Sequence, residues 1–227
     1  MDNNLHAGHR EKLKARFLKS GLDAFEPHNA LELLLFYAIP RKDTNELAHR
    51  LMKIFGSFSA VLDAPVEQLM EVEGVGKNAA VLLKMIPQLC RLYLDDSNQG
   101  SRQLQSSEEF GSYLLPKFVG MTVEGVYLLC MDNRNKILFS QMISTGGTVN
   151  ASSVTIRTIV EAAVRCQATQ VVLAHNHPQG FALPSQQDIA STRAIAQHLQ
   201  ALGIRLTDHI IVAKDDYVSL AQSGLLG

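Results

Sequence analysis

The chain has 227 residues, of which 46% are hydrophobic and 19% charged, and its formal net charge at pH 7 is −1. This composition is typical of a globular protein with room for two domains of about 100 residues each, and no apolar run approaches the length of a membrane span. The near-neutral charge argues against a protein whose main role is to coat nucleic acid.

Residues 1–95 are expected to form an all-α domain, because their apolar residues recur with a helical period. Thr44 stands where the third predicted helix begins and is its expected N-cap, since a threonine hydroxyl accepts a hydrogen bond from a first-turn amide. The first three predicted helices lie around Leu13, over residues 30–37 and over residues 44–55.

Residues 69–82 predict two helices joined by a Gly-Val-Gly turn, a pattern that resembles the helix-hairpin-helix module. Gly74 and Gly76 would let main-chain N–H groups at the second helix approach a DNA phosphate, and Lys77 adds positive charge. The same hairpin also packs antiparallel helices or contacts proteins. Residues 1–95 hold twelve Lys/Arg and twelve Asp/Glu, so we expect any DNA contact to be weak.

The stretch over residues 36–48 is a candidate second copy of this hairpin. It also joins two predicted helices through a short turn, with Arg41 and Lys42 at the tip. The N-terminal half would then be a pair of pseudo-repeated hairpins, but an unrelated helical bundle accounts for the pattern equally well.

The character of the sequence changes at residues 96–105, which are polar, aperiodic and contain Gly and Ser, as a linker does. In residues 106–227 helical and strand patterns alternate, which predicts an α/β domain with a mixed sheet flanked by helices. The predicted helices cover residues 107–118, 152–166 and 185–202, and the predicted strands cover residues 126–131, 136–143, 170–174 and 204–212.

The three cysteines, Cys90, Cys130 and Cys166, lie in apolar contexts and form no Cys-x-x-Cys pair. They are expected to be reduced thiols rather than ligands of a structural zinc. The N-terminal residues have no signal-peptide pattern, so we expect a cytoplasmic protein without membrane contact.

A candidate metal site follows the predicted strand at residues 170–174. His175 and His177 are two residues apart, so in an extended chain both imidazoles point to the same face. Asp188 follows a Pro- and Gly-containing loop and lies in the first turn of the next predicted helix. Two histidines and one carboxylate leave a position open for water, which is the ligand set of a catalytic zinc. We therefore predict that these three side chains bind Zn²⁺.

Other roles for the residues around this site remain open. Ser185 precedes Asp188 by three residues and is a good N-cap for the same helix, and this role is compatible with metal binding by Asp188. The two histidines taken alone could be loop residues held by hydrogen bonds. His209 is a rival ligand or a support for one, and Asp208 is a second candidate support.

The string His-x-His, seven residues, Ser, two residues, Asp resembles the metalloprotease motif of JAB/MPN (JAMM) domains. The surrounding sequence is similar to the bacterial RadC-like (UPF0758) proteins within that superfamily, and the likeness extends over most of the chain. The similar stretches are Gly8–Arg10, Gly147–Thr148, Val154 and Arg157, Ala174–Pro178, Gly180, Pro184–Ser185 and Asp208–Val212.

The resemblance implies a JAB/MPN-like C-terminal domain and zinc-dependent hydrolysis of peptide or isopeptide bonds in a peptide or protein substrate. In JAMM enzymes the serine that matches Ser185 hydrogen-bonds the developing oxyanion, and a glutamate that opens the first strand acts as general base. Glu124 precedes the first predicted strand and is our choice for this base. Glu161 is the alternative, although its mid-helix place four residues after Arg157 favours an ordinary ion pair.

The chain departs from the family pattern beside the expected metal site. Gln179 and Phe181 stand where small or acidic residues are usual, and Thr155-Ile156 replaces an aromatic–Pro pair. These changes make the loop unusually apolar and leave the substrate open. A second class of function is also open: a DNA-repair-associated protein whose hairpins hold nucleic acid and whose metal site is vestigial.

Overall fold

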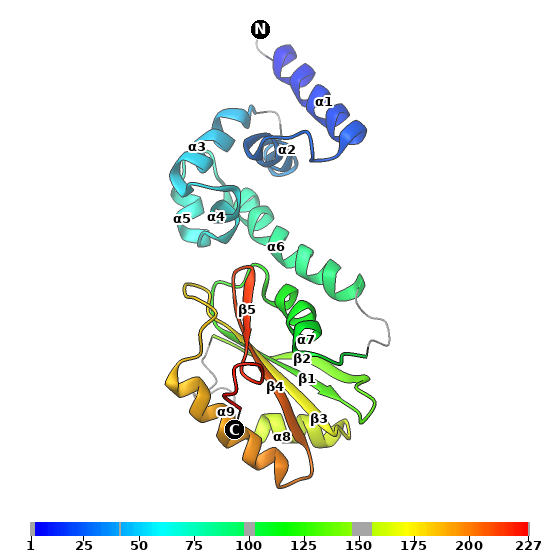
Figure 1. Cartoon of the computed structure of the whole chain (residues 1–227). Coiled ribbons are helices and arrows are strands. Elements are labelled where there is room, and N and C mark those ends of the chain that lie inside the picture. The colour runs from blue at the N-terminus through cyan, green and yellow to red at the C-terminus, as the bar shows by residue number, and fades with distance from the viewer. Residues whose placement is uncertain (1–2, 41, 98–102, 147–155, 227) are drawn as a thin grey trace. The chain divides into compact units, whose positions relative to one another are not determined.

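The computed structural model describes residues 3–40, 42–97, 103–146 and 156–226 (Figure 1). The chain divides into two compact units, Met1–Leu89 and Cys90–Gly227. Within the described ranges, no helix combines the length and the apolar character needed to cross a membrane. Several residues discussed above lie outside the described ranges: Arg41, part of the predicted linker, Gly147, Thr148, Val154 and Thr155.

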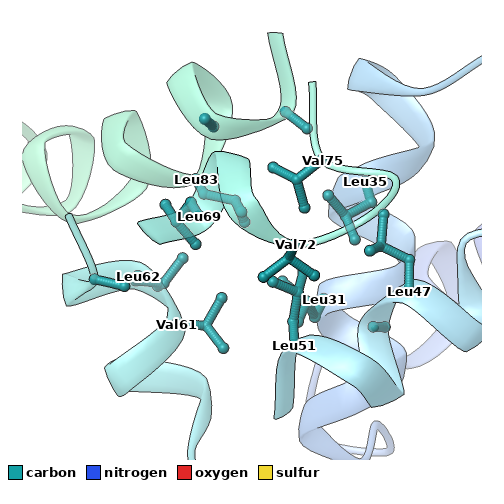
Figure 2. Close-up of a cluster of buried hydrophobic side chains, with 14 residues drawn as sticks. Leu31, Leu35, Leu47, Leu51, Val61, Leu62, Leu69, Val72, Val75 and Leu83 are labelled. Carbon is teal, nitrogen blue, oxygen red and sulfur yellow. The ribbon is translucent and has the colours of Figure 1, made fainter. Parts of the chain in front are cut away.

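The N-terminal unit is all-α, as the helical periodicity predicts. Its helices are α1 (Asn3–Ser20), α2 (Pro27–Ala38), α3 (Asn45–Phe55), α4 (Phe58–Asp63), α5 (Val66–Glu71) and the first part of α6 (Lys77–Ser97). Buried side chains from α2 to α6 and from the α5–α6 turn meet in one core, in which Leu31, Leu51 and Val72 lie close together (Figure 2). The six-residue α4 is too short to show a periodic pattern in the sequence.

The predicted Gly-Val-Gly hairpin joins α5 to α6. Gly74 has φ 98°, a left-handed conformation that suits glycine, and Val75 donates its N–H to the carbonyl of Val72 at 2.9 Å. Val75 points into the core (Figure 2), whereas the space around the Gly76 α-carbon is open. Val75 thus anchors the turn in the core. Gly76 is exposed, and so is Lys77, the first residue of α6.

A buried carboxylate ties α1 to the rest of the N-terminal unit. Glu32 is fully buried, and its oxygens pair with His9 Nε2 at 2.7 Å and Asn45 Nδ2 at 2.8 Å. Arg10 donates to backbone carbonyls of the turn that follows α2. Thr44 stands at the N-cap of α3, as predicted, but its hydroxyl donates to the Glu32 carbonyl instead of accepting from a helix amide.

The C-terminal unit contains a five-stranded mixed sheet, in the order β2-β1-β3-β4-β5. Only β3 and β4 pair in parallel among these neighbours. The strands are β1 (Gly125–Met131), β2 (Ile137–Thr145), β3 (Gln170–Asn176), β4 (Arg205–Ala213) and β5 (Asp216–Ser219). The helices are α7 (Ser107–Leu114), the 3-10 helix η1 (Leu115–Phe118), α8 (Ile156–Arg165) and α9 (Gln186–Gln200). The mixed sheet between helices confirms the predicted fold class; the short β5 was not predicted.

Helices cover both faces of this sheet (Figure 1). Val171 and Leu173 of β3 pack in the cluster that includes α8 and α9, whereas Val172 and Ala174 pack in the cluster that includes α7 and η1. Every residue of β3 is buried. Because side chains alternate along a strand, Val171, Leu173 and His175 point to the same face of the sheet, which is the face that α9 covers.

Candidate metal centre

The end of β3 and the start of α9 bring the three predicted ligands together. His175 is the sixth residue of β3, and His177 is the first residue after the strand. The His177 N–H donates to the Val212 carbonyl of β4 at 2.7 Å. Asp188 lies in the first turn of α9. Among the described residues, one group of three potential metal ligands was found, and it consists of these three side chains, with ligand atoms all within 4.8 Å of one another.

The distances between the ligand atoms suit a small tetrahedral cation. His175 Nε2 lies 2.9 Å from His177 Nε2 and 3.4 Å from Asp188 Oδ1, and His177 Nε2 lies 3.7 Å from Asp188 Oδ2. Around a tetrahedral zinc with bonds of about 2.0–2.1 Å, ligand atoms are about 3.3–3.4 Å apart. The distances from His175 Nε2 to His177 Nε2 and to Asp188 Oδ1, 2.9 and 3.4 Å, lie near that value, and the third distance runs to the other oxygen, Asp188 Oδ2.

A buried chain of hydrogen bonds fixes which nitrogen of His175 carries the proton. Thr192 Oγ1 lies 2.6 Å from the Asp188 carbonyl, which can only accept, so the hydroxyl donates there. The hydroxyl must then accept from His209 Nδ1, also at 2.6 Å. Neutral His209 is left with a lone pair on Nε2, which faces His175 Nδ1 at 2.8 Å. His175 therefore donates through Nδ1, and its Nε2 carries a lone pair.

A single hydrogen bond indicates which nitrogen of His177 carries the proton. Its Nδ1 lies 3.1 Å from the carbonyl oxygen of Phe181, which can only accept a hydrogen bond. In the neutral imidazole Nδ1 is then the donor, and Nε2 carries the lone pair. Both Nε2 atoms and the Asp188 carboxylate thus direct electron pairs at one point, without a hydrogen to share between the two imidazoles. A bound cation relieves this repulsion, so the donor set fits a metal ion.

Burial supports the neutral form of His175. The residue is 2% exposed, and desolvation lowers its pKa to about 4, with the Asp188 carboxylate opposing the shift and His177 adding to it. Burial also lowers the pKa of the fully buried His209 well below its ordinary value. At pH 7 the imidazole of His175 is therefore available as a ligand without first losing a proton.

Asp188 is oriented by Ser185, the N-cap of α9. Asp188 Oδ2 accepts from the Ser185 N–H at 2.8 Å and from Ser185 Oγ at 2.6 Å, while Ser185 Oγ accepts from the Asp188 N–H at 3.0 Å. This is a reciprocal capping box. Because Oδ2 receives both bonds, Oδ1 is the oxygen directed at His175.

Glu124 lies beside the same pocket as His177. The two residues line a pocket of about 400 Å³, with Thr122 and residues 178–180. Each lies two residues beyond the Val126–His175 pair, where the antiparallel ladder of β1 and β3 ends.

The alternative base, Glu161, is placed differently. It lies on α8, its side chain is half exposed, and its Oε1 accepts from Arg157 Nε at 2.6 Å. It does not line the pocket beside His177. Of the two glutamates, Glu124 therefore lines the pocket that contains His177, and Glu161 pairs with Arg157.

The two residues of β4 suggested as supports have separate roles. His209 stands behind His175 and bonds to its Nδ1, so its place is that of a support and not of a fourth ligand in the group. Asp208 contacts the backbone of His209: its carboxylate accepts from the His209 N–H at 2.7 Å, from Ser219 Oγ at 2.7 Å and from the Ala221 N–H at 3.1 Å. These bonds join Asp208 to the backbone of the residue that supports His175 and to the segment at β5.

The sequence reasoning missed Thr192 and Asn176. Thr192 follows Asp188 by four residues, so helical spacing alone would have placed both on one face of α9. Asn176 stands between the two histidines, and its contacts with the segment before β1 depend on strand pairing, which the sequence does not reveal. Gly74, Gly76 and Lys77, the predicted nucleic-acid contacts, lie in the N-terminal unit.

The fold and the ligand group define an α/β domain with a candidate metal centre. Residues 104–225 match the family described as RadC-like JAB domain. The whole chain is 32% identical, over 233 residues and the full length of both proteins, to the UPF0758 protein FN0909 of Fusobacterium nucleatum subsp. nucleatum. The chain therefore belongs to the RadC-like JAB domain family, as the motif around His175 predicts.

Proposed function

We propose that the protein is a zinc-dependent hydrolase of peptide or isopeptide bonds. The observation that carries this proposal is the convergence of three electron-pair donors, His175 Nε2, His177 Nε2 and Asp188, next to a pocket that Glu124 lines. Three protein ligands leave a fourth position open, which is the arrangement of catalytic rather than structural zinc sites. The JAB-type domain agrees with this chemistry.

Zinc held by these ligands would acidify a water molecule and polarise the substrate carbonyl. Glu124 then accepts a proton from the attacking water and delivers it to the leaving amine. Ser185 Oγ lies 2.6 Å from Asp188 Oδ2, and redirection of its hydrogen toward the substrate would stabilise the developing oxyanion. The pocket beside His177, of about 400 Å³, would receive the peptide bond.

The test combines metal analysis with a peptide-library cleavage screen. The wild-type protein should hold one zinc per chain after dialysis against a weak chelator, and His177→Ala should lose it, because three ligands are the minimum for such a site. Glu124→Gln should keep the zinc and the fold and lose about 100-fold or more in cleavage rate. Glu161→Gln, a matched change on the exposed face of α8, should cleave at the wild-type rate.

Three results would contradict the proposal. Stoichiometric zinc in His177→Ala would show that the ligand assignment is wrong. A wild-type protein that takes up no zinc from micromolar solution would favour the alternative of a vestigial site. An unimpaired Glu124→Gln beside an inactive, zinc-loaded Glu161→Gln would move the general base to Glu161.

A second candidate function, weak nucleic-acid binding, rests on the N-terminal unit. The turns after α2 and before α6 line one pocket of about 580 Å³, with Lys42 from one turn and Gly76 and Lys77 from the other. We propose that backbone amides at the start of α6 and the two lysines contact phosphates there. Gly76→Glu should abolish duplex binding without harming the fold, because the space around this glycine is open. Unchanged binding would leave the hairpin a structural or protein-contact element.

A further inference from the structure

The side chain of Asn176 holds both ends of the residue that we propose as general base. Asn176 lies between the two histidine ligands and is 3% exposed. Its Oδ1 accepts from the Gly125 N–H at 2.7 Å, and its Nδ2 donates to the Val123 carbonyl at 3.2 Å. These two backbone groups flank Glu124 on either side.

Hydrogen bonds hold the backbone of this segment on both sides. The side chain of Val123 is 50% exposed, so it contributes little buried contact. The Glu124 carbonyl accepts from the Gly146 N–H at 2.7 Å, which holds the segment toward β2. Asn176 supplies the corresponding bonds toward β3, at the point where the β1–β3 ladder ends.

We propose that Asn176 is a positioning residue, whose carboxamide sets the distance between the Glu124 carboxylate and the metal ligands. The inference rests on the proposed function, in which Glu124 is the general base. Its physical basis is that His175, Asn176 and His177 are consecutive, so one three-residue segment carries two ligands and the group that holds the base. A carboxamide is needed because it offers an acceptor to Gly125 and a donor to Val123 together.

Glycine at position 125 is part of the same arrangement. A Cβ atom there would come within 2.5 Å of Met121 Cε and 3.2 Å of the Ser144 carbonyl oxygen. The absence of a side chain therefore lets the Gly125 amide approach Asn176 while β2 packs against its other side. A displacement of about 1 Å in a reacting group can cost on the order of 100-fold in rate, so small shifts of this segment matter.

The test compares Asn176→Ala with Gln170→Ala in the full-length, zinc-loaded protein. Gln170 is a matched control: it is a buried amide at the other end of β3, and it donates to the Asp132 carbonyl at 3.1 Å. In Asn176→Ala the Gly125 amide should exchange with solvent at least about 10-fold faster. Zinc content should stay at one per chain, kcat for the library peptide should fall about 10- to 100-fold, and KM should change little. Gln170→Ala should keep the wild-type kcat.

A double-mutant cycle separates positioning from a merely structural role. If Asn176 acts through Glu124, Asn176→Ala should cause no further loss of kcat in the Glu124→Gln background. Asn176→Asp, which has the same shape, keeps the acceptor for Gly125 and loses the donor for Val123. In Asn176→Asp the Gly125 amide should stay protected from solvent exchange, and kcat should fall less than in Asn176→Ala. This variant replaces Asn176→Ala in the test if Asn176→Ala fails to fold.

Two results would contradict the inference about Asn176 and leave the proposed function intact. The first is a wild-type kcat in Asn176→Ala or Asn176→Asp while Glu124→Gln is inactive. The second is an equal loss of kcat from Asn176→Ala in the wild-type and Glu124→Gln backgrounds. A fall in rate that follows loss of zinc would also count against it. A wild-type protein that cleaves no library peptide would remove the proposed function, and the positioning role with it.

Discussion

Replacement of His209 by phenylalanine should weaken zinc binding more than it weakens the fold. The phenylalanine ring keeps most of the buried volume and removes both hydrogen bonds of the imidazole, to His175 Nδ1 and to Thr192 Oγ1. In the metal-bound form His175 must keep its proton on Nδ1, which would then have no acceptor. In the metal-free form the proton can move to Nε2 and be shared with His177 or Asp188.

The expected loss follows from this difference between the two forms. A buried donor without a partner costs about 1–3 kcal/mol, and here the cost falls on the metal-bound form. Because each 1.4 kcal/mol is a factor of ten in a dissociation constant, the zinc Kd should rise by about 10- to 100-fold. Removal of groups that support metal ligands typically has an effect of this size.

The zinc Kd is measured by competition with a chromophoric chelator, and stability is measured in EDTA. His198→Phe is the control, because His198 is an exposed histidine on α9 whose Nδ1 donates to the Ala194 carbonyl one turn earlier. It should bind zinc like the wild-type protein. A zinc Kd in His209→Phe within about twofold of the wild-type value would refute the hydrogen-bond chain from Thr192 to His175.

Two further predictions concern pH and Ser185. In EDTA the free energy of unfolding should fall as the pH is lowered from 6.5 toward 4. Burial holds the pKa of His175 at about 4 and that of His209 well below normal, so the unfolded chain takes up protons that the folded chain does not. Urea denaturation at pH 7 and pH 4.5 measures this, and equal stabilities would contradict it. Ser185→Ala should lose about 1 kcal/mol of stability with the cap and, if Ser185 stabilises the oxyanion, about 100-fold in rate. A lower Tm with unchanged turnover would leave only the cap.

The sequence predicted those parts of the site that depend on local spacing. Residues i and i+2 of an extended chain share a face, so His175 and His177 could be placed together before their environment was known. Ser185 and Asp188 could be paired because the capping box is also a local pattern. Glu124 is predicted from the resemblance to JAMM domains and from its place before the first strand, and in the structure it lines one pocket with His177.

The supporting contacts could not be predicted, because they join segments that are distant in sequence. Thr192 meets His209 only where α9 packs against β4, and Asn176 meets Val123 and Gly125 only at the end of the β1–β3 ladder. The contact of His177 with the Phe181 carbonyl uses a backbone oxygen, which every residue has, so no residue type could indicate it.

These contacts show that the protein itself orients each ligand. His209 holds His175, the Phe181 carbonyl holds His177, and Ser185 holds one oxygen of Asp188. The two oxygens of Asp188 have different partners: Oδ2 accepts from Ser185 in the capping box, and Oδ1 faces His175. In small zinc-dependent domains the metal supplies the folding energy, and the ligands have no fixed place without it. Here the hydrophobic cores and these hydrogen bonds supply the fixed geometry, so we infer that the metal enters a site that is already formed.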